Sequence, residues 1–136
     1  MTSRRSLADG VSDRFVELWS ERRPCTLVTP RRDGTPHAVP VGVTVDVGER
    51  IARVICSAGS QKARNVVAAG PGGARVAVSL VEGRTWSTLE GVAFVRDDPA
   101  VVHDAERRYA AEYKEPRVNP QRVVLEIAVD RVLGNA

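Results

Sequence analysis

The chain has 136 residues and a net charge of +3, so it is long enough for one domain with its own core and carries only a mild basic excess. Hydrophobic residues make up 43%, charged residues 27% and aromatic residues only 4%, which is a globular composition with few aromatics. The scarcity of aromatics argues against a module that stacks nucleic-acid bases, and the mild charge suits a small anionic ligand better than a long duplex.

The N-terminal residues are polar and show no periodicity, so we expect a frayed tail over residues 1–11 and a single domain over 12–136. Ser12 is a suitable N-cap for a helix over 13–22, and Pro24 should end that helix. The large apolar side chains of this segment recur at spacings of three and four and therefore share one face: Phe15, Leu18 and Trp19.

Two runs with the character of β-strands follow, with a turn between them. Residues 25–29 predict a strand, and Asp33 with Gly34 is a dipeptide typical of hairpin turns. The second run, 36–45, alternates, and its valines fall on one face: Val39, Val41, Val43 and Val45. Because Pro40 has no N–H to donate, this strand should have an open or irregular side.

The rest of the chain predicts four more strands and two helices. The strands are expected over 51–57, 75–81, 85–95 and 122–129, and the helices over 61–69 and 99–113. This order contains no repeated βαβ unit, so a parallel doubly wound sheet is not expected. We predict a mainly β fold, a six-stranded antiparallel split β-barrel with short flanking helices, since a barrel also removes exposed strand edges.

The two cysteines, Cys25 and Cys56, lie in separate apolar runs without the spacing of a metal site or a CxxC pair. We therefore expect buried free thiols in a reducing cytoplasm, and no metal site. The first residues show no apolar signal region, and no run approaches the roughly 18 apolar residues of a membrane span. The expected location is the cytoplasm, away from the membrane.

The stretch over residues 56–65 is the best candidate for a binding site, because a strand runs into a small-residue turn that opens a helix. The first N–H groups of a helix have no partner within it and attract anions. Gly59 lets a ligand approach the backbone, and Lys62 lies in the first turn, where a cation is favourable beside a bound anion. The pattern predicts a phosphate site with polar neighbours: Ser57, Ser60 and Asn65. The alternative is a capping serine beside a solvated lysine.

Three runs in a fixed order carry a family resemblance. They are Gly-Ser-Gln-Lys followed by Asn over 59–65, Trp-Ser-x-Leu-Glu-Gly over 86–91, and Arg-Tyr…Tyr-x-x-Pro-Arg-x-Asn-Pro over 108–120. With them, nearly the whole chain after residue 12 resembles the pyridoxamine-phosphate-oxidase-like split-barrel superfamily of flavin- and F420-binding proteins. Within it, the chain is most similar to the subgroup described as F420-dependent biliverdin reductases.

The resemblance implies a homodimer with two cofactor sites at the subunit interface. In each site, reduced coenzyme F420 would give a hydride to a small-molecule acceptor, as in the reduction of biliverdin to bilirubin. The residue that holds the cofactor phosphate in this family falls on Lys62, surrounded by Ser57, Ser60, Gln61 and Asn65. The cofactor ring would lie along the strand formed by Pro36, His37, Val39, Pro40 and Val41, and Trp86 would come from the partner subunit.

The residues alone leave alternatives open. The cofactor could be FMN, since both cofactors present a phosphate, or the chain could be a non-catalytic carrier of a flavin, heme or tetrapyrrole. By pattern alone, His37 and Trp86 also fit structural roles, and Tyr109 and Tyr113 fit packing of their helix on the barrel. The Arg107-Arg108 pair and Arg117 could meet carboxylates of a tetrapyrrole or of the cofactor tail, or be solvated surface. No catalytic side chain is assigned, because the cofactor carries the hydride chemistry.

Overall fold

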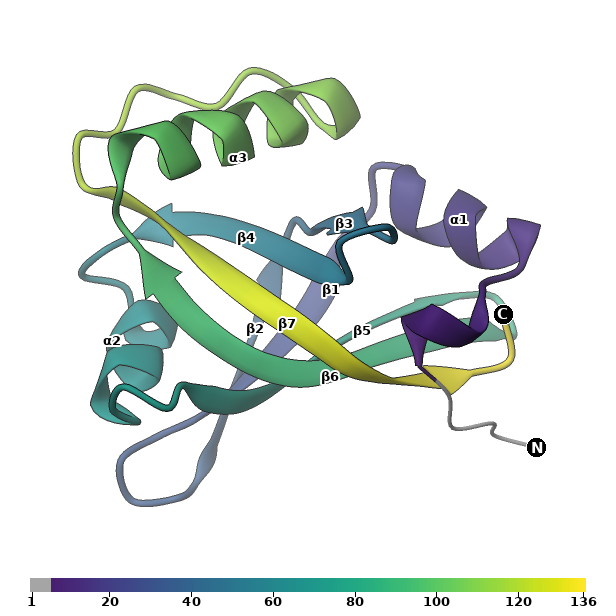
Figure 1. The fold of residues 1–136 in the computed structure, drawn as a ribbon, viewed down its shortest axis with the longest axis horizontal. Coiled ribbons are helices and arrows are strands. Elements are labelled where there is room, and N and C mark those ends of the chain that lie inside the picture. The colour runs from purple at the N-terminus through teal and green to yellow at the C-terminus, as the bar shows by residue number, and fades with distance from the viewer. Residues whose placement is uncertain (1–5) are drawn as a thin grey trace.

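The computed structural model describes residues 6–136, and in that range seven strands form one antiparallel sheet in the order β2-β1-β5-β6-β7-β4-β3 (Figure 1). The strands are β1 (Cys25–Pro30), β2 (Pro36–Val41), β3 (Thr44–Asp46), β4 (Ile51–Ser57), β5 (Ala74–Glu82), β6 (Thr85–Arg96) and β7 (Arg122–Gly134). The helices are α1 (Asp13–Ser20), α2 (Gln61–Ala68) and α3 (Pro99–Glu112), preceded by a short 3-10 helix, η1 (Leu7–Asp9). The predicted class, a mainly β antiparallel barrel with short helices, is confirmed, with seven strands in place of six.

The additional strand appears because the run predicted as one strand over 36–45 is two strands. β2 pairs with β1 and β3 pairs with β4, at opposite ends of the strand order. Only Gly42 and Val43 separate β2 from β3, so the two edges of the sheet lie next to each other at this point and the barrel closes. The buried Val43 turns into the core there.

The core fills the inside of the barrel and is extended by α1, which packs near β3 (Figure 1). As predicted, Ser12 caps this helix, and its side-chain oxygen accepts the N–H of Phe15 at 3.0 Å. Phe15, Leu18 and Trp19 are all buried. The indole N–H of Trp19 donates to the buried Ser87 hydroxyl at 3.0 Å, which ties the helix to β6.

The N-terminal segment is more ordered than the predicted tail. Residues 1–5 of that tail lie outside the described residues. From Ser6 onward the chain is packed, because Ser6 caps η1 and Leu7 is buried against the core. A single apolar residue in a polar stretch has no periodicity, so the sequence pattern gave no sign of this contact.

β7 continues five residues beyond its predicted end at residue 129, through to Gly134. Its pairing with β6 shifts register between Glu90 and Gly91, which face Arg131 and Val129, so Asp130 is the extra residue of a β-bulge. The bulge interrupts the alternation of the sequence at Asp130, and the prediction stopped there. Asp130 is paired outside the sheet with Arg75, whose guanidinium donates to it at 2.5 and 3.1 Å.

Candidate functional site

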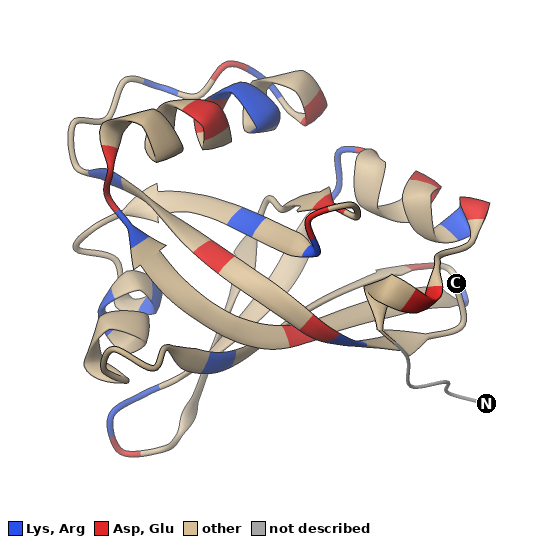
Figure 2. Ribbon diagram, in the orientation of Figure 1, with Lys and Arg blue, Asp and Glu red and all other residues tan. Residues whose placement is uncertain are grey.

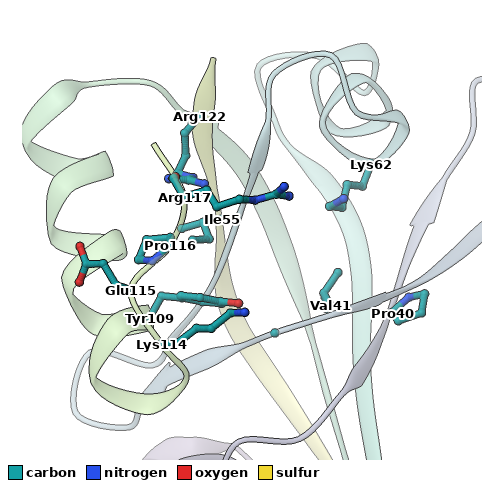
Figure 3. Close-up of a pocket in the computed structure, with 11 residues that line it drawn as sticks. Pro40, Val41, Ile55, Lys62, Tyr109, Lys114, Glu115, Pro116, Arg117 and Arg122 are labelled. Carbon is teal, nitrogen blue, oxygen red and sulfur yellow. The ribbon is translucent and has the colours of Figure 1, made fainter. Parts of the chain in front are cut away.

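A pocket of about 580 Å³ lies where α2, the β2–β3 crossing and the segment after α3 meet (Figure 3). Its lining residues are Pro40, Val41, Gly42, Ile55, Lys62, Tyr109, Lys114, Glu115, Pro116, Arg117 and Arg122. The pocket therefore joins residues from β2, β4, α2, α3 and β7, and it contains three of the predicted cofactor residues: Pro40, Val41 and Lys62.

The apolar part of the pocket is formed by Val41 of β2 and Ile55 of β4. Gly42 follows Val41, and a Cβ there would lie 3.0 Å from Tyr109 and 3.1 Å from Tyr113. The two tyrosine rings stack, with centroids 4.8 Å apart and planes 12° apart. Because residue 42 has no side chain, α3 can bring an aromatic ring against the backbone between β2 and β3.

The helix α2 begins at the pocket, at the residue where the sequence predicted a helix to start. Ser60 is its N-cap, and the Ser60 hydroxyl accepts the N–H of Ala63 at 3.4 Å. The N–H groups of the first helical residues, Gln61 and Lys62, have no partner inside a helix and point out of its end. The helix carries Lys62 and Arg64 and no acidic residue, whereas α3 carries residues of both signs (Figure 2).

Most of the positive charge in the pocket is unpaired. Within residues 6–136, no ion pair or side-chain hydrogen bond engages the side chains of Lys62, Lys114 or Arg117. Many arginines elsewhere do have carboxylate partners: Arg14, Arg23, Arg75, Arg96, Arg107, Arg108 and Arg131. The acidic residue of the lining, Glu115, points its carboxylate away from the other labelled side chains (Figure 3). The pocket is therefore built to receive an anion.

The fourth cation, Arg122, holds the pocket wall together. Its Nη1 donates to Glu106 Oε2 of α3 at 2.7 Å and to the carbonyl of Arg117 at 2.8 Å. Its side chain is only 11% exposed. The same wall is tied to β4, since Asn119 donates to the Ser57 hydroxyl at 2.9 Å.

The remaining predicted residues lie around the pocket or away from it. Asn65 is buried and donates to Thr29 Oγ1 at 3.0 Å, while its Oδ1 accepts from Gln61 at 2.7 Å. Pro36 lines a separate hollow of about 340 Å³, which does not include Lys62. His37 has a buried Nδ1 without a hydrogen-bond partner among the described residues. Val39 is half-buried on β2 and is not part of the pocket lining.

Trp86 lies at the start of β6 and outside the pocket lining. Its backbone N–H donates to Asn135 Oδ1 at 2.9 Å. Sequence reasoning missed Lys114 and Arg122, which the fold brings to the pocket from the two ends of one loop. The only signal for them was the Tyr-x-x-Pro-Arg-x-Asn-Pro run that spans this loop.

Cys25 and Cys56 are both buried and free, as predicted. Burial raises the pKa of the Cys25 thiol to about 12, with the Glu112 carboxylate adding to the effect, so this cysteine is an inert core residue. In residues 6–136, no His, Cys, Asp or Glu side chains gather in groups of three or more that could hold a metal ion. None of the helices described is long and apolar enough to span a membrane.

Comparison with known proteins relates the chain to one family. The family model for pyridoxamine 5'-phosphate oxidase matches residues 11–136. A protein of Mycobacterium tuberculosis (strain CDC 1551 / Oshkosh) described as an F420H(2)-dependent biliverdin reductase is 47% identical over 126 residues, which cover 93% of this chain and 89% of that protein.

Solved structures show the same fold. A conserved hypothetical protein from Mycobacterium tuberculosis superposes with a TM-score of 0.72 and 25% identity, over 90% of this chain and 82% of that one. A structure described as an F420 reductase has a TM-score of 0.68 and 23% identity, over 90% of this chain and 98% of that one.

Proposed function

Because the chain belongs to the pyridoxamine 5'-phosphate oxidase family, we propose that it is an oxidoreductase that uses reduced coenzyme F420 to reduce an unsaturated acceptor, biliverdin. The observation that carries the proposal is the pocket that joins unpaired cations to an apolar wall. The relative that is 47% identical over 93% of the chain is described by this same cofactor and this same substrate.

The residues of the pocket fit an F420-type cofactor, which combines a flat tricyclic ring with a phosphodiester and an acidic tail. The unpaired Lys62 and the free N–H groups at the start of α2 suit the phosphate. Val41 and Ile55 provide an apolar surface for the ring. When bound, the reduced cofactor supplies a hydride, and the protein orients the ring and excludes water from one of its faces.

The roles of the individual side chains belong to the same proposal. Lys62 binds the phosphate, while Ser57, Ser60 and Gln61 hold the loop and helix end that present it. Pro40 and Val41 contact the ring, with Pro36, His37 and Val39 continuing the strand beside it.

We further propose a cytoplasmic homodimer. Trp86 lies outside its own pocket, so a contact with the cofactor would have to be made across a subunit interface. Measurement of the molar mass by light scattering tests the dimer. A monomer that still binds F420 and reduces biliverdin would contradict a site shared between subunits.

A cofactor titration tests the proposed site. The purified protein is titrated with F420 and with FMN, and the titrations are repeated on Lys62→Ala and on the control Arg84→Gln, an exposed cation outside the pocket. We expect tight binding of F420, weakened about tenfold to hundredfold by Lys62→Ala and unchanged by the control. A preference for FMN, or an unchanged affinity in Lys62→Ala, would contradict the proposed site.

Turnover is measured as the loss of biliverdin absorbance in the presence of reduced F420. The proposed activity requires that the protein accelerate this loss well beyond the rate with reduced F420 alone. Tight cofactor binding without any such acceleration would indicate a carrier of the cofactor and would rule out the proposed reaction.

A further inference from the structure

The cations of the pocket form two groups that come from different parts of the chain. Lys62 stands alone on α2, and three others lie between the end of α3 and the start of β7: Lys114, Arg117 and Arg122. In Figure 3, Lys62 lies above Val41, whereas Lys114 and the two arginines enter the pocket from the side of α3. We call Lys114, Arg117 and Arg122 the loop cations.

The loop cations are held at the pocket by contacts that leave two of them free. Arg122 is fixed by Glu106 and by the carbonyl of Arg117, so the backbone at residue 117 has a defined position. The end of the loop is also fixed, because the N–H of Ala58 donates to the carbonyl of Gln121 at 2.8 Å. Lys114 and Arg117 are exposed at the pocket, and their side chains have no partner within residues 6–136.

One phosphate beside Lys62 does not account for this second group. Placing the phosphate at Lys62 and the ring against Val41 and Ile55 leaves Lys114 and Arg117 without a role, although they line the same pocket. They therefore border the space next to the ring, where an acceptor must lie to receive a hydride.

We propose that Lys114 and Arg117, positioned by Arg122 and Glu106, bind carboxylate groups of the acceptor and make the enzyme selective for acidic acceptors. This inference rests on the proposed function. A linear tetrapyrrole such as biliverdin has an apolar conjugated backbone with two propionate carboxylates, which match an apolar wall bordered by free cations. Neutral acceptors of the same shape are expected to bind more weakly.

The test compares biliverdin with its dimethyl ester, which has the same backbone without the two charges. The variants are the double substitution Lys114→Gln with Arg117→Gln and the control Arg84→Gln. Binding to the F420-loaded protein is measured by absorbance, and turnover is measured separately. We expect the double variant to bind biliverdin about tenfold or more weakly, with KM for biliverdin raised by a similar factor. Affinity for the ester should change less than about twofold, and the Kd for F420 should not change.

The outcomes separate this inference from the proposed function. Equal losses for biliverdin and its ester, no loss at all, or no binding of biliverdin to the unmodified protein would overturn the inference. A raised Kd for F420 with unchanged biliverdin binding would overturn it too, and would assign the loop cations to the cofactor tail. Charge-dependent binding of biliverdin without turnover would support the carboxylate site and refute the proposed reaction.

Discussion

The hydroxyl of Tyr113 accepts a hydrogen bond from the backbone N–H of Val43 at 3.0 Å. The same oxygen lies 3.2 Å from the carbonyl of Arg23 and 3.3 Å from that of Val43, so its own hydrogen also has an acceptor. One side chain at the end of α3 thus provides hydrogen-bond partners for the backbone between β2 and β3. This link fixes α3, and Tyr109 with it, against the wall of the pocket.

Tyr113→Phe is expected to lower the free energy of unfolding by about 1–2 kcal/mol, because it leaves the Val43 N–H without its acceptor. Tyr109→Phe is the matched control, since no hydrogen bond engages the Tyr109 hydroxyl within residues 6–136. Urea unfolding of both variants provides the measurement. Equal stabilities of the two variants would show that the Tyr113 hydroxyl does not stabilise the backbone between β2 and β3.

Asn65→Ala is expected to destabilise the protein by about 1–3 kcal/mol, since it removes a buried amide that joins α2 to Thr29 of β1. Lys62→Ala, one helical turn away, should leave the stability within about 0.5 kcal/mol of the unmodified protein. Thermal or urea unfolding compares the two variants. A loss of cofactor affinity in Asn65→Ala at full stability would mean that this amide binds the ligand directly.

Gly59→Ala is expected to leave the free protein as stable as before, because a Cβ at this position meets no atom within 4 Å. The affinity for F420 should nevertheless fall several-fold, since the methyl group would stand where the phosphate approaches the start of α2. Gly72→Ala is the matched control, because its Cβ also meets nothing within 4 Å. Equal affinities of both variants would place the phosphate elsewhere.

Local signals predicted most of the elements correctly. Ser12 caps α1 as expected, Ser60 caps α2 as the alternative interpretation had it, and Pro99 opens α3 behind the cap Asp98. The errors lie where the pattern depends on distant partners. The valines over 36–45 alternate through Gly42, yet the strand divides there, because β2 and β3 pair with opposite edges of the sheet. Alternation alone does not show which partner each half of such a run takes.

The family and cofactor predicted from three sequence runs agree with the comparisons. Chemistry along the chain found Lys62, and the resemblance placed the cofactor ring along Val41; these two residues do meet in one pocket. It could not show that the Asn65 amide is already engaged by Thr29 and Gln61, because that depends on where β1 lies beside α2. The sequence pattern also did not predict that Lys114 and Arg122 line the same pocket, because the turn of the loop after α3 brings them together.

Glu112 makes the stability of the protein depend on pH. One of its carboxylate oxygens, Oε2, is buried without a hydrogen-bond partner among the described residues, and burial raises the pKa of this carboxyl from 4.5 to about 7. Between these two values the folded protein keeps a proton that the unfolded chain has released. Stability contributed by Glu112 is therefore fully present below about pH 4.5 and is lost as the pH rises through about 7.

Glu112→Gln should remove this pH dependence, because glutamine remains neutral at every pH. Urea unfolding at about pH 5 and about pH 7.5 is expected to show the variant gaining stability relative to the unmodified protein as the pH rises. Glu115→Gln, an exposed carboxyl nearby, controls for the removal of one negative charge. A constant difference between Glu112→Gln and the unmodified protein at both pH values would mean that Glu112 is ionised in the fold and that its oxygen finds a partner in solution.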